Sequence, residues 1–80
     1  MLLTIKYFGA LADITHKKEE QLRFETPDHS LQGIKQELEK KYPAIKTTHY
    51  TMALNKSIAL PDAKINEHDE LALLPPFAGG

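Results

Sequence analysis

Hydrophobic and polar residues alternate in several parts of the chain, as expected of β-strands that bury one face. The predicted strands are residues 1–8, 21–25 and 51–54, a short returning strand that carries Ile58 and Leu60, and residues 71–74. Their inward-facing side chains are Leu3, Ile5, Tyr7, Leu22, Phe24, Met52, Leu54, Leu71 and Leu73. The charged residues 17–20 are expected to form a solvated loop, so the first two strands pair as a hairpin.

A different spacing predicts one main helix. Its apolar face is formed by Leu31, Ile34, Leu38 and Tyr42, which repeat at intervals of three and four residues. Ser30 is a good N-cap, and Pro43 ends the helix. Gly33 lies within the helix and costs about 1 kcal/mol relative to alanine, which indicates either close packing or simple tolerance at that position.

The remaining segments are short. Residues 10–14 are expected to form one helical turn, residues 44–50 to connect the helix to the next strand, and Ile65 to fill part of the core. One helix covering one face of a four- or five-stranded mixed sheet is the β-grasp, or ubiquitin-like, arrangement. We therefore expect an α+β fold, with a β-grasp domain over residues 1–74 and an extended C-terminal tail over residues 75–80.

Three apolar residues are predicted on or near the sheet face that the helix leaves uncovered. They are Phe8, Ile58 and Leu74, and all three fall near the start of the tail in the expected fold. Scattered apolar side chains occur on every protein surface. Because these three gather near one point, we interpret them as a docking patch for a partner protein.

The composition narrows the class of function. The chain has 80 residues, of which 41% are hydrophobic and 26% charged, and a formal charge of −1 with both signs mixed along its length. This size predicts a single domain without a deep active site of its own. The charge gives no reason to expect nucleic acid or an anionic membrane as a partner. No apolar stretch is long enough to cross a bilayer, and the N-terminus lacks a signal-peptide pattern, so a cytoplasmic protein is expected.

Metal and thiol chemistry have little support in the residues. The chain has no cysteine, so any sulfur chemistry must use sulfur supplied by another molecule. Its four histidines are widely separated, with no pair at the spacing of helical metal ligands. We therefore expect no metal site and no tightly bound cofactor.

The tail has the sequence Pro75, Pro76, Phe77, Ala78, Gly79 and Gly80. Each proline disfavours helical backbone for the residue before it, so the chain should leave its last strand extended. The two glycines can pass through an opening too narrow for a Cβ atom. At about 3.3 Å per residue, the tail reaches roughly 20 Å. These features predict that residues 75–79 thread into a partner protein and carry Gly80 into its pocket.

Gly80 is the predicted reactive residue. A C-terminal carboxylate is an anion at neutral pH and a poor electrophile, so it needs activation. Condensation with a nucleotide phosphate would give a mixed anhydride with a good leaving group. Attack by sulfur would then yield a thioacid.

The closing run 69–80 resembles the signature of the small subunit of molybdopterin synthase, a β-grasp sulfur carrier. The resemblance covers the whole chain in length and element order. It includes an opening strand that ends in Tyr7 and Phe8 and a turn at Leu54 and Asn55.

The chain departs from the family pattern in two places. Phe77 replaces the usual valine, and Leu73 and Leu74 stand where aromatic residues often occur. All three replacements remain apolar, so they concern the shape of the docking tail and not the chemistry of its end.

The resemblance implies a route for sulfur. An ATP-dependent adenylyltransferase related to ubiquitin E1 would adenylate Gly80, and a sulfurtransferase would supply the sulfur that converts it to a thiocarboxylate. The tail would enter the large subunit of molybdopterin synthase and donate sulfur to cyclic pyranopterin monophosphate. Two small and two large subunits form the usual assembly. The catalytic side chains belong to the large subunit, so this chain would be a sulfur-donating cosubstrate, docked through Phe8, Ile58 and Leu74.

Three other functions remain open. A sulfur carrier for thiamin thiazole synthesis would share the fold and the activation of Gly80, although such carriers usually lack the two prolines. A ubiquitin-like modifier would join Gly80 to lysine side chains of target proteins. A plain β-grasp binding module would not need Gly80.

Overall fold

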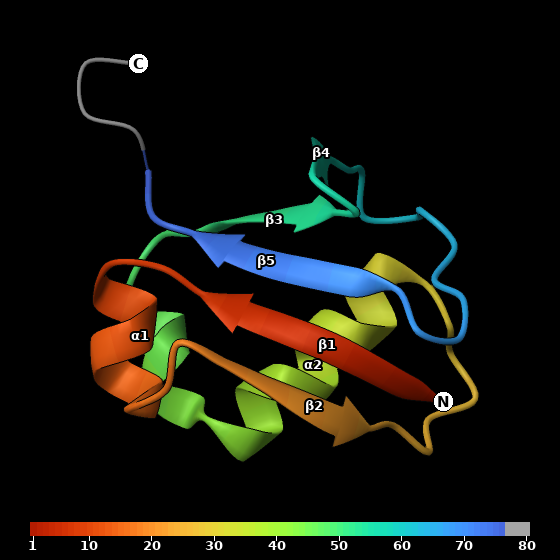
Figure 1. Cartoon of the computed structure of the whole chain (residues 1–80), viewed down its shortest axis with the longest axis horizontal. Helices are drawn as coiled ribbons and strands as arrows, with labels where there is room; N and C mark the ends of the chain where they lie inside the picture. Colours follow the sequence, from red (N-terminus) through yellow and green to blue (C-terminus); the bar gives the residue numbers. More distant parts are fainter. Residues whose placement is uncertain (77–80) are drawn as a thin grey trace.

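The structure is a computed structural model that describes residues 1–76 (Figure 1). Its elements are the strand β1 (Leu2–Tyr7), the short helix α1 (Ala10–Thr15), the strand β2 (Glu19–Arg23), the main helix α2 (Leu31–Lys41), the 3-10 helix η1 (Pro43–Thr47) and the strands β3 (Thr51–Leu54), β4 (Ser57–Ile58) and β5 (Glu70–Leu74). The order of hairpin, helix, short strands and final strand is the one predicted.

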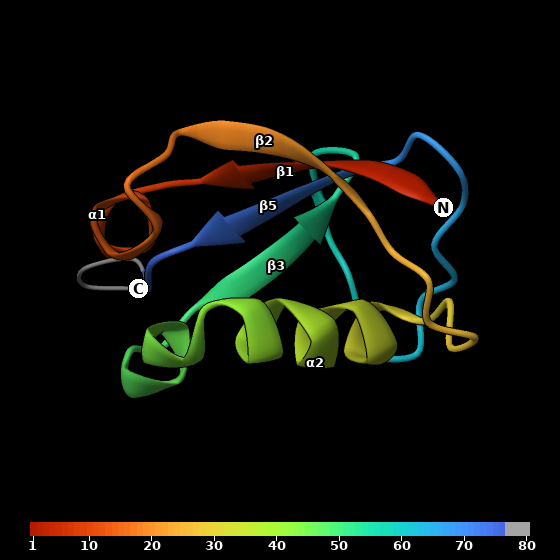
Figure 2. The same cartoon turned by 90° about the horizontal axis from the view of Figure 1, so that it is seen from below.

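The strands form a five-stranded sheet in the order β2-β1-β5-β3-β4. The central strands β1 and β5 run parallel, whereas the other neighbouring strands run antiparallel, so the sheet is mixed. The helix α2 packs on one face of the sheet (Figure 2), and Figure 1 looks onto the opposite face. This is the β-grasp fold, and the prediction of fold class is confirmed.

The core lies between the sheet and α2. Leu71 and Leu73 of β5 are completely buried, as are Ile5 of β1 and Ile34 of α2. The full core consists of Leu3, Ile5, Tyr7, Leu11, Phe24, Leu31, Ile34, Leu38, Ile45, Met52, Ile65, Leu71 and Leu73. The predicted inward positions are confirmed for β1 and β5, and Ile65 fills the core as expected.

The N-terminal end of α2 explains the glycine inside the helix. The Ser30 hydroxyl accepts a hydrogen bond from the Gly33 N–H at 3.1 Å, which confirms the predicted N-cap. The same hydroxyl donates to Asp28 Oδ1 at 2.6 Å, which draws the preceding loop over the helix. A Cβ atom on Gly33 would lie 2.5 Å from Asp28 Cγ. Close packing, and not tolerance, is therefore the reason for the glycine.

The prediction of a solvated loop over residues 17–20 was wrong in its second half. The strand β2 begins at Glu19, and Glu20 pairs with Ile5 in β1. The Glu20 side chain is turned toward the interior, where three hydrogen-bond donors meet its carboxylate. The charge of Glu20 predicted a solvent-exposed side chain, but these three hydrogen bonds offset the cost of removing the carboxylate from water.

Three further predictions need correction. Residues 43–47 form η1 and place Ile45 in the core, where an irregular connector was expected. The returning strand β4 ends at Ile58, so Leu60 lies outside the sheet and is 73% exposed. Pro61 cannot donate to a ladder, and its carbonyl instead accepts from Gln32 N–H of α2 at 2.9 Å. Leu54, predicted to face inward, is only half-buried.

Candidate functional site

The C-terminal ends of β1 and β5 meet at one edge of the sheet, beside α1 (Figure 1). Their pairing continues one residue past β1, because the Phe8 N–H donates to the Leu73 carbonyl at 3.2 Å. Tyr7 pairs with Leu73 and both are buried. Successive side chains of a strand point to opposite faces, so Phe8 and Leu74 belong to the face away from α2. The tail therefore leaves the sheet beside Phe8.

Ile58 lies on the same face of the sheet, as the pairing through two alanines shows. It pairs with Ala53 of β3, and Ala53 pairs with Ala72 of β5. Residues directly opposite one another in a ladder share a face, and Ala72 precedes Leu74 by two positions. Phe8 is 45% exposed and Ile58 62% exposed, whereas Leu74 is half-buried. We call these five residues the apolar patch.

The structure thus places Phe8, Ile58 and Leu74 on the face that α2 leaves uncovered, with Phe8 beside Leu74 and Ile58 two strands away from Leu74. Their use as a docking surface stays a prediction. The predicted patch did not include the two alanines between them. Ala53 is 5% and Ala72 9% exposed, so the middle of the patch is made of small side chains that are themselves buried. The alternation of β3 and β5 by itself puts both alanines on this face, but only the register between the strands shows that they lie between Ile58 and Leu74.

Gly9 forms the contact between the end of β1 and the root of the tail. Its backbone has φ +56°, a conformation that is unfavourable for residues with a Cβ atom. A Cβ atom at this position would lie 3.0 Å from Pro75 Cγ. The absence of a side chain at Gly9 therefore makes room for the first proline of the tail.

The tail itself is described only at its start. Pro75 is half-buried against the domain and Pro76 is exposed. The remaining predicted tail residues, Phe77, Ala78, Gly79 and the reactive Gly80, lie outside the described residues. The predictions for these four residues therefore rest on the sequence alone.

A hollow of about 370 Å³ opens beside the root of the tail. It is lined by Lys6, Tyr7, Phe8, Gly9, Ala12, Lys18 and Glu19. The Lys6 ammonium of β1 forms a salt bridge at 3.3 Å with Glu70 of the neighbouring strand β5. The apolar patch therefore has a polar and charged margin on the side of β1 and β2.

A partly buried hydrogen-bond cluster supports this end of β1 from the other face. The hydroxyls of Tyr7 and Tyr42 donate to Glu20 Oε2 at 2.6 and 2.7 Å, and Lys17 Nζ donates to Glu20 Oε1 at 3.0 Å. The rings of Tyr7 and Tyr42 meet edge to face, with centroids 5.9 Å apart. The cluster ties β1, β2 and the end of α2 together directly behind Phe8.

The cluster also shifts the titration of its members. Burial opposes ionisation of Glu20, but the hydrogen bonds from Tyr7, Tyr42 and Lys17 outweigh it and lower the pKa of the carboxyl group. Burial raises the pKa of the Tyr7 hydroxyl far above its usual range, and the hydrogen bond to Glu20 adds to the rise. At neutral pH the cluster therefore holds a carboxylate and two neutral phenols.

No three histidine, aspartate or glutamate side chains of residues 1–76 gather in a way that would hold a metal ion. Among the described helices, none combines the length and apolar character needed to span a membrane.

The fold and the apolar patch beside a C-terminal tail define a ubiquitin-like β-grasp protein. The family model described as the ThiS family matches residues 5–80. The chain therefore belongs to the ThiS family of ubiquitin-like sulfur carriers.

Solved structures with the same fold come from several proteins. SAMP1 from Haloferax volcanii, a small archaeal modifier protein, is 22% identical with a TM-score of 0.82, and the match covers 100% of both chains. A putative molybdopterin converting factor subunit 1 from Pyrococcus furiosus is 16% identical with a TM-score of 0.86, over 96% of this chain and 99% of that chain. A chain in the complex of subunits 1 and 2 of the molybdopterin-converting factor from Helicobacter pylori is 20% identical with a TM-score of 0.69, over 100% of both chains.

Proposed function

We propose that this sulfur carrier is the small subunit of a molybdopterin synthase. In this role an E1-like adenylyltransferase activates Gly80, a sulfurtransferase supplies sulfur, and the carrier docks on the large synthase subunit. There the thiocarboxylate donates its sulfur to cyclic pyranopterin monophosphate, in an assembly of two small and two large subunits.

One observation carries the docking part of this proposal: the tail begins inside the apolar patch. Leu74 belongs to the patch, and Pro75 follows it directly while packing against Gly9. A partner that covers Phe8, Ile58 and Leu74 therefore also lies at the root of the tail. Binding energy from the patch would hold the reactive end in one direction, which reduces the entropy lost when the tail enters a pocket.

The proposed chemistry needs three balanced steps. A Gly80 carboxylate oxygen attacks the α-phosphate of ATP, which forms the acyl adenylate and releases pyrophosphate. A persulfide sulfur of the sulfurtransferase then attacks the acyl carbon and expels AMP, which leaves an acyl disulfide. A second thiol attacks the donor's inner sulfur, forms a disulfide with it and releases the Gly80 thiocarboxylate. The thiocarboxylate sulfur then attacks a carbon of the pterin precursor and displaces an oxygen substituent there, after which water cleaves the acyl–sulfur bond and returns Gly80 as a carboxylate. The protein contributes the end group and its delivery.

The tail sequence, and not the fold, favours molybdopterin synthesis over related functions. Similar folds occur in a modifier protein and in molybdopterin converting factor subunits at comparable identity, so the fold does not choose between them. The step Pro75–Pro76 before the closing glycines is typical of the molybdopterin synthase small subunit and is usually missing from thiazole carriers. A thiazole carrier and a protein modifier remain the alternatives.

The activation step is tested by the intact mass of the full chain after incubation with its E1-like enzyme, ATP and a sulfurtransferase loaded with sulfur. We expect the mass to rise by the replacement of one oxygen by one sulfur. A chain without Gly80 should show no change. An unchanged mass in the complete reaction would contradict the carrier function.

The pathway is tested by reconstitution. The thiocarboxylated chain should convert cyclic pyranopterin monophosphate to molybdopterin when the large synthase subunit is present. Productive transfer to a thiazole synthase instead, or isopeptide bonds between Gly80 and lysines of other proteins in cells, would favour one of the alternatives.

A further inference from the structure

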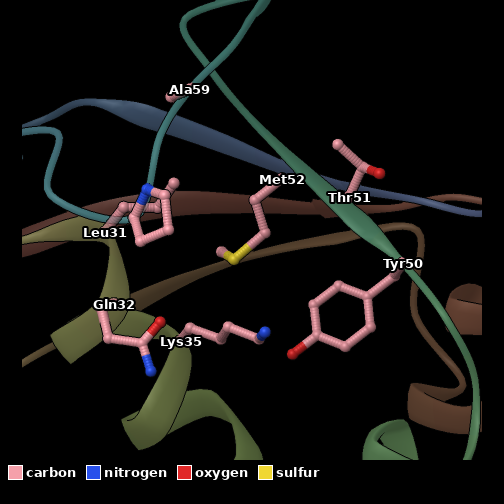
Figure 3. A pocket seen from close by; sticks show the side chains of 8 residues that line it. Leu31, Gln32, Lys35, Tyr50, Thr51, Met52 and Ala59 are labelled. Atoms are coloured by element: carbon pink, nitrogen blue, oxygen red, sulfur yellow. The ribbon is translucent and has the colours of Figure 1, made fainter.

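A second pocket lies on the opposite side of the sheet from the apolar patch, between β3 and the first turns of α2 (Figure 3). It encloses about 200 Å³. Leu31, Met52 and Ala59 contribute apolar surface, while Gln32, Lys35 and Tyr50 are polar residues of its lining. We call it the β3–α2 pocket. It shares no lining residue with the apolar patch, so the proposed carrier function does not account for it.

The walls of this pocket are fixed by hydrogen bonds. The segment after β4 crosses to α2, where Pro61 and Ala63 carbonyls accept from the N–H groups of Gln32 and Leu31 at 2.9 and 2.8 Å. These N–H groups belong to the first turn of the helix and have no partner inside it. On the other side, the Ala59 N–H reaches the Met52 carbonyl only at 3.4 Å. The chain thus separates from β3 just where the pocket opens.

The polar side of the pocket carries a positive charge. Lys35 Nζ lies over the Tyr50 ring, 5.3 Å from its centroid, and Tyr50 is held in place by a 2.6 Å hydrogen bond from its hydroxyl to Glu39. Figure 3 shows the Lys35 side chain extending toward Tyr50. Within residues 1–76, no carboxylate oxygen lies within 4.0 Å of the Lys35 ammonium. A ligand with a carboxylate would complement this charge.

The size of the pocket and its surroundings favour a peptide over a small molecule. A volume of about 200 Å³ is below the roughly 300 to 1,000 Å³ of small-molecule sites but accommodates a single aliphatic side chain. Leu60 belongs to the segment that forms one wall and is 73% exposed, the highest value among the large apolar side chains of residues 1–76. Beyond β4, the Ala59 N–H still reaches the Met52 carbonyl, so the outer side of β3 is occupied as far as Met52. An extended segment would therefore lie across the opening of the pocket, beside the segment that carries Leu60, and would not pair along the whole of β3.

We propose that the β3–α2 pocket and Leu60 bind an extended peptide segment of a partner protein. The segment inserts one aliphatic side chain against Met52 and places an aspartate or glutamate near Lys35. Because this surface is on the other face of the sheet from the apolar patch, one protein holds the carrier here while the patch and the tail engage another. The proposal does not depend on the chemistry of Gly80.

The test uses the full chain, immobilised, and a phage-displayed library of random twelve-residue peptides. We expect enriched peptides to combine an aliphatic residue with an acidic residue close by. Synthetic copies should shift the backbone amide signals of Met52 and Ala59 in nuclear magnetic resonance spectra. Lys35→Glu and Leu60→Asp should each weaken binding at least about tenfold, because they reverse the charge and remove the apolar contact. Phe8→Asp, on the opposite face, is the matched control and should leave the affinity within about twofold.

A charge swap makes the test decisive. A peptide in which lysine replaces the acidic residue should not bind the natural chain and should bind the Lys35→Glu variant. The proposal is overturned if no peptide is enriched, if the enriched peptides lack acidic residues, or if their binding depends on Phe8 and not on Lys35. Signal shifts at Met52 that appear on raising the protein concentration without peptide would instead identify a second copy of this chain as the occupant, which also overturns it.

Discussion

Pro75 packs against Gly9, so the first residue of the tail rests on bare backbone at the end of β1. A Cβ atom on Gly9 would come within 3.0 Å of Pro75 Cγ, and the φ of +56° at Gly9 is itself unfavourable for other residues. The direction in which the tail leaves the domain is therefore set by two residues 66 positions apart in the sequence.

Substitution of Gly9 should affect both stability and delivery of the tail. We expect Gly9→Ala to lower the free energy of unfolding by about 1–3 kcal/mol, because alanine must adopt the strained backbone and displace Pro75. It should also reduce the rate of sulfur transfer by the thiocarboxylated chain on its partner subunit, measured at a temperature where the variant is fully folded. Gly33→Ala, at the far end of the domain, is the control and should lower stability without slowing transfer. Equal transfer rates for both variants would argue against a role of Gly9 in directing the tail.

The apolar patch should determine affinity for the protein that receives the tail. Phe8→Ala and Leu74→Asp are expected to weaken binding to the large synthase subunit by about tenfold or more, because both residues are accessible and lie beside the tail root. Isothermal titration calorimetry measures the change, and circular dichroism checks that the fold is retained. Leu60→Asp is the matched control, since Leu60 is also exposed but lies outside the patch. Unchanged affinity for Phe8→Ala and Leu74→Asp would remove the docking role.

The Glu20 cluster should make stability depend on acidic pH. Because the folded state lowers the pKa of Glu20 below its ordinary value of 4.5, its contribution is present above that pH and is lost as the pH falls through the folded-state pKa. We expect Glu20→Gln to lower the free energy of unfolding by about 1–2 kcal/mol at pH 7, because hydrogen bonds to a charged group are stronger than those to a neutral amide.

The same difference should shrink toward zero in strongly acidic solution, where both chains carry a neutral group at this position. Urea unfolding of the two proteins across the pH range measures it. Glu19→Gln, on the exposed side of β2, is the control and should change stability by no more than about 0.5 kcal/mol. A difference for Glu20→Gln that stays constant with pH would mean that the charge of Glu20 contributes nothing.

Gly33 offers a test in which packing and helix propensity have opposite signs. In an exposed helix, alanine in place of glycine stabilises by about 1 kcal/mol. Here the added Cβ would lie 2.6 Å from the Asp28 carbonyl oxygen, so we expect Gly33→Ala to destabilise by about 1–3 kcal/mol. Thermal unfolding measures the sign, and Gln36→Ala on the exposed face of α2 is the control for propensity. A rise in melting temperature for Gly33→Ala would show that the loop at Asp28 can move away from the added Cβ atom at little energetic cost.

Some parts of the fold follow from local patterns because each depends on residues close together in the chain. The alternation around Leu3, Ile5 and Tyr7 predicts β1, and Ser30 with the apolar repeat after it predicts the start and face of α2. The periodicities of 2 and 3.6 residues belong to single elements, so no knowledge of distant contacts is needed. The fold class follows from the order of these elements.

Other parts could not be predicted locally because their causes are distant in the sequence. Glu20 looked like a solvated charge, yet Tyr7 and Tyr42 supply the hydrogen bonds that keep it at the edge of the core. Leu60 was expected in a strand, but the carbonyl of the following proline is engaged by the N-terminal end of α2.

The sequence by itself determined the fold class, the main helix and the chemistry expected of the closing residues, since all three depend on local spacing and residue type. Only the tertiary structure decided how Phe8, Ile58 and Leu74 share one face, how Pro75 meets Gly9, and that a separate pocket lies between β3 and α2. The physical reason is that these relationships depend on strand order and register, which arise when distant segments pack around a common core.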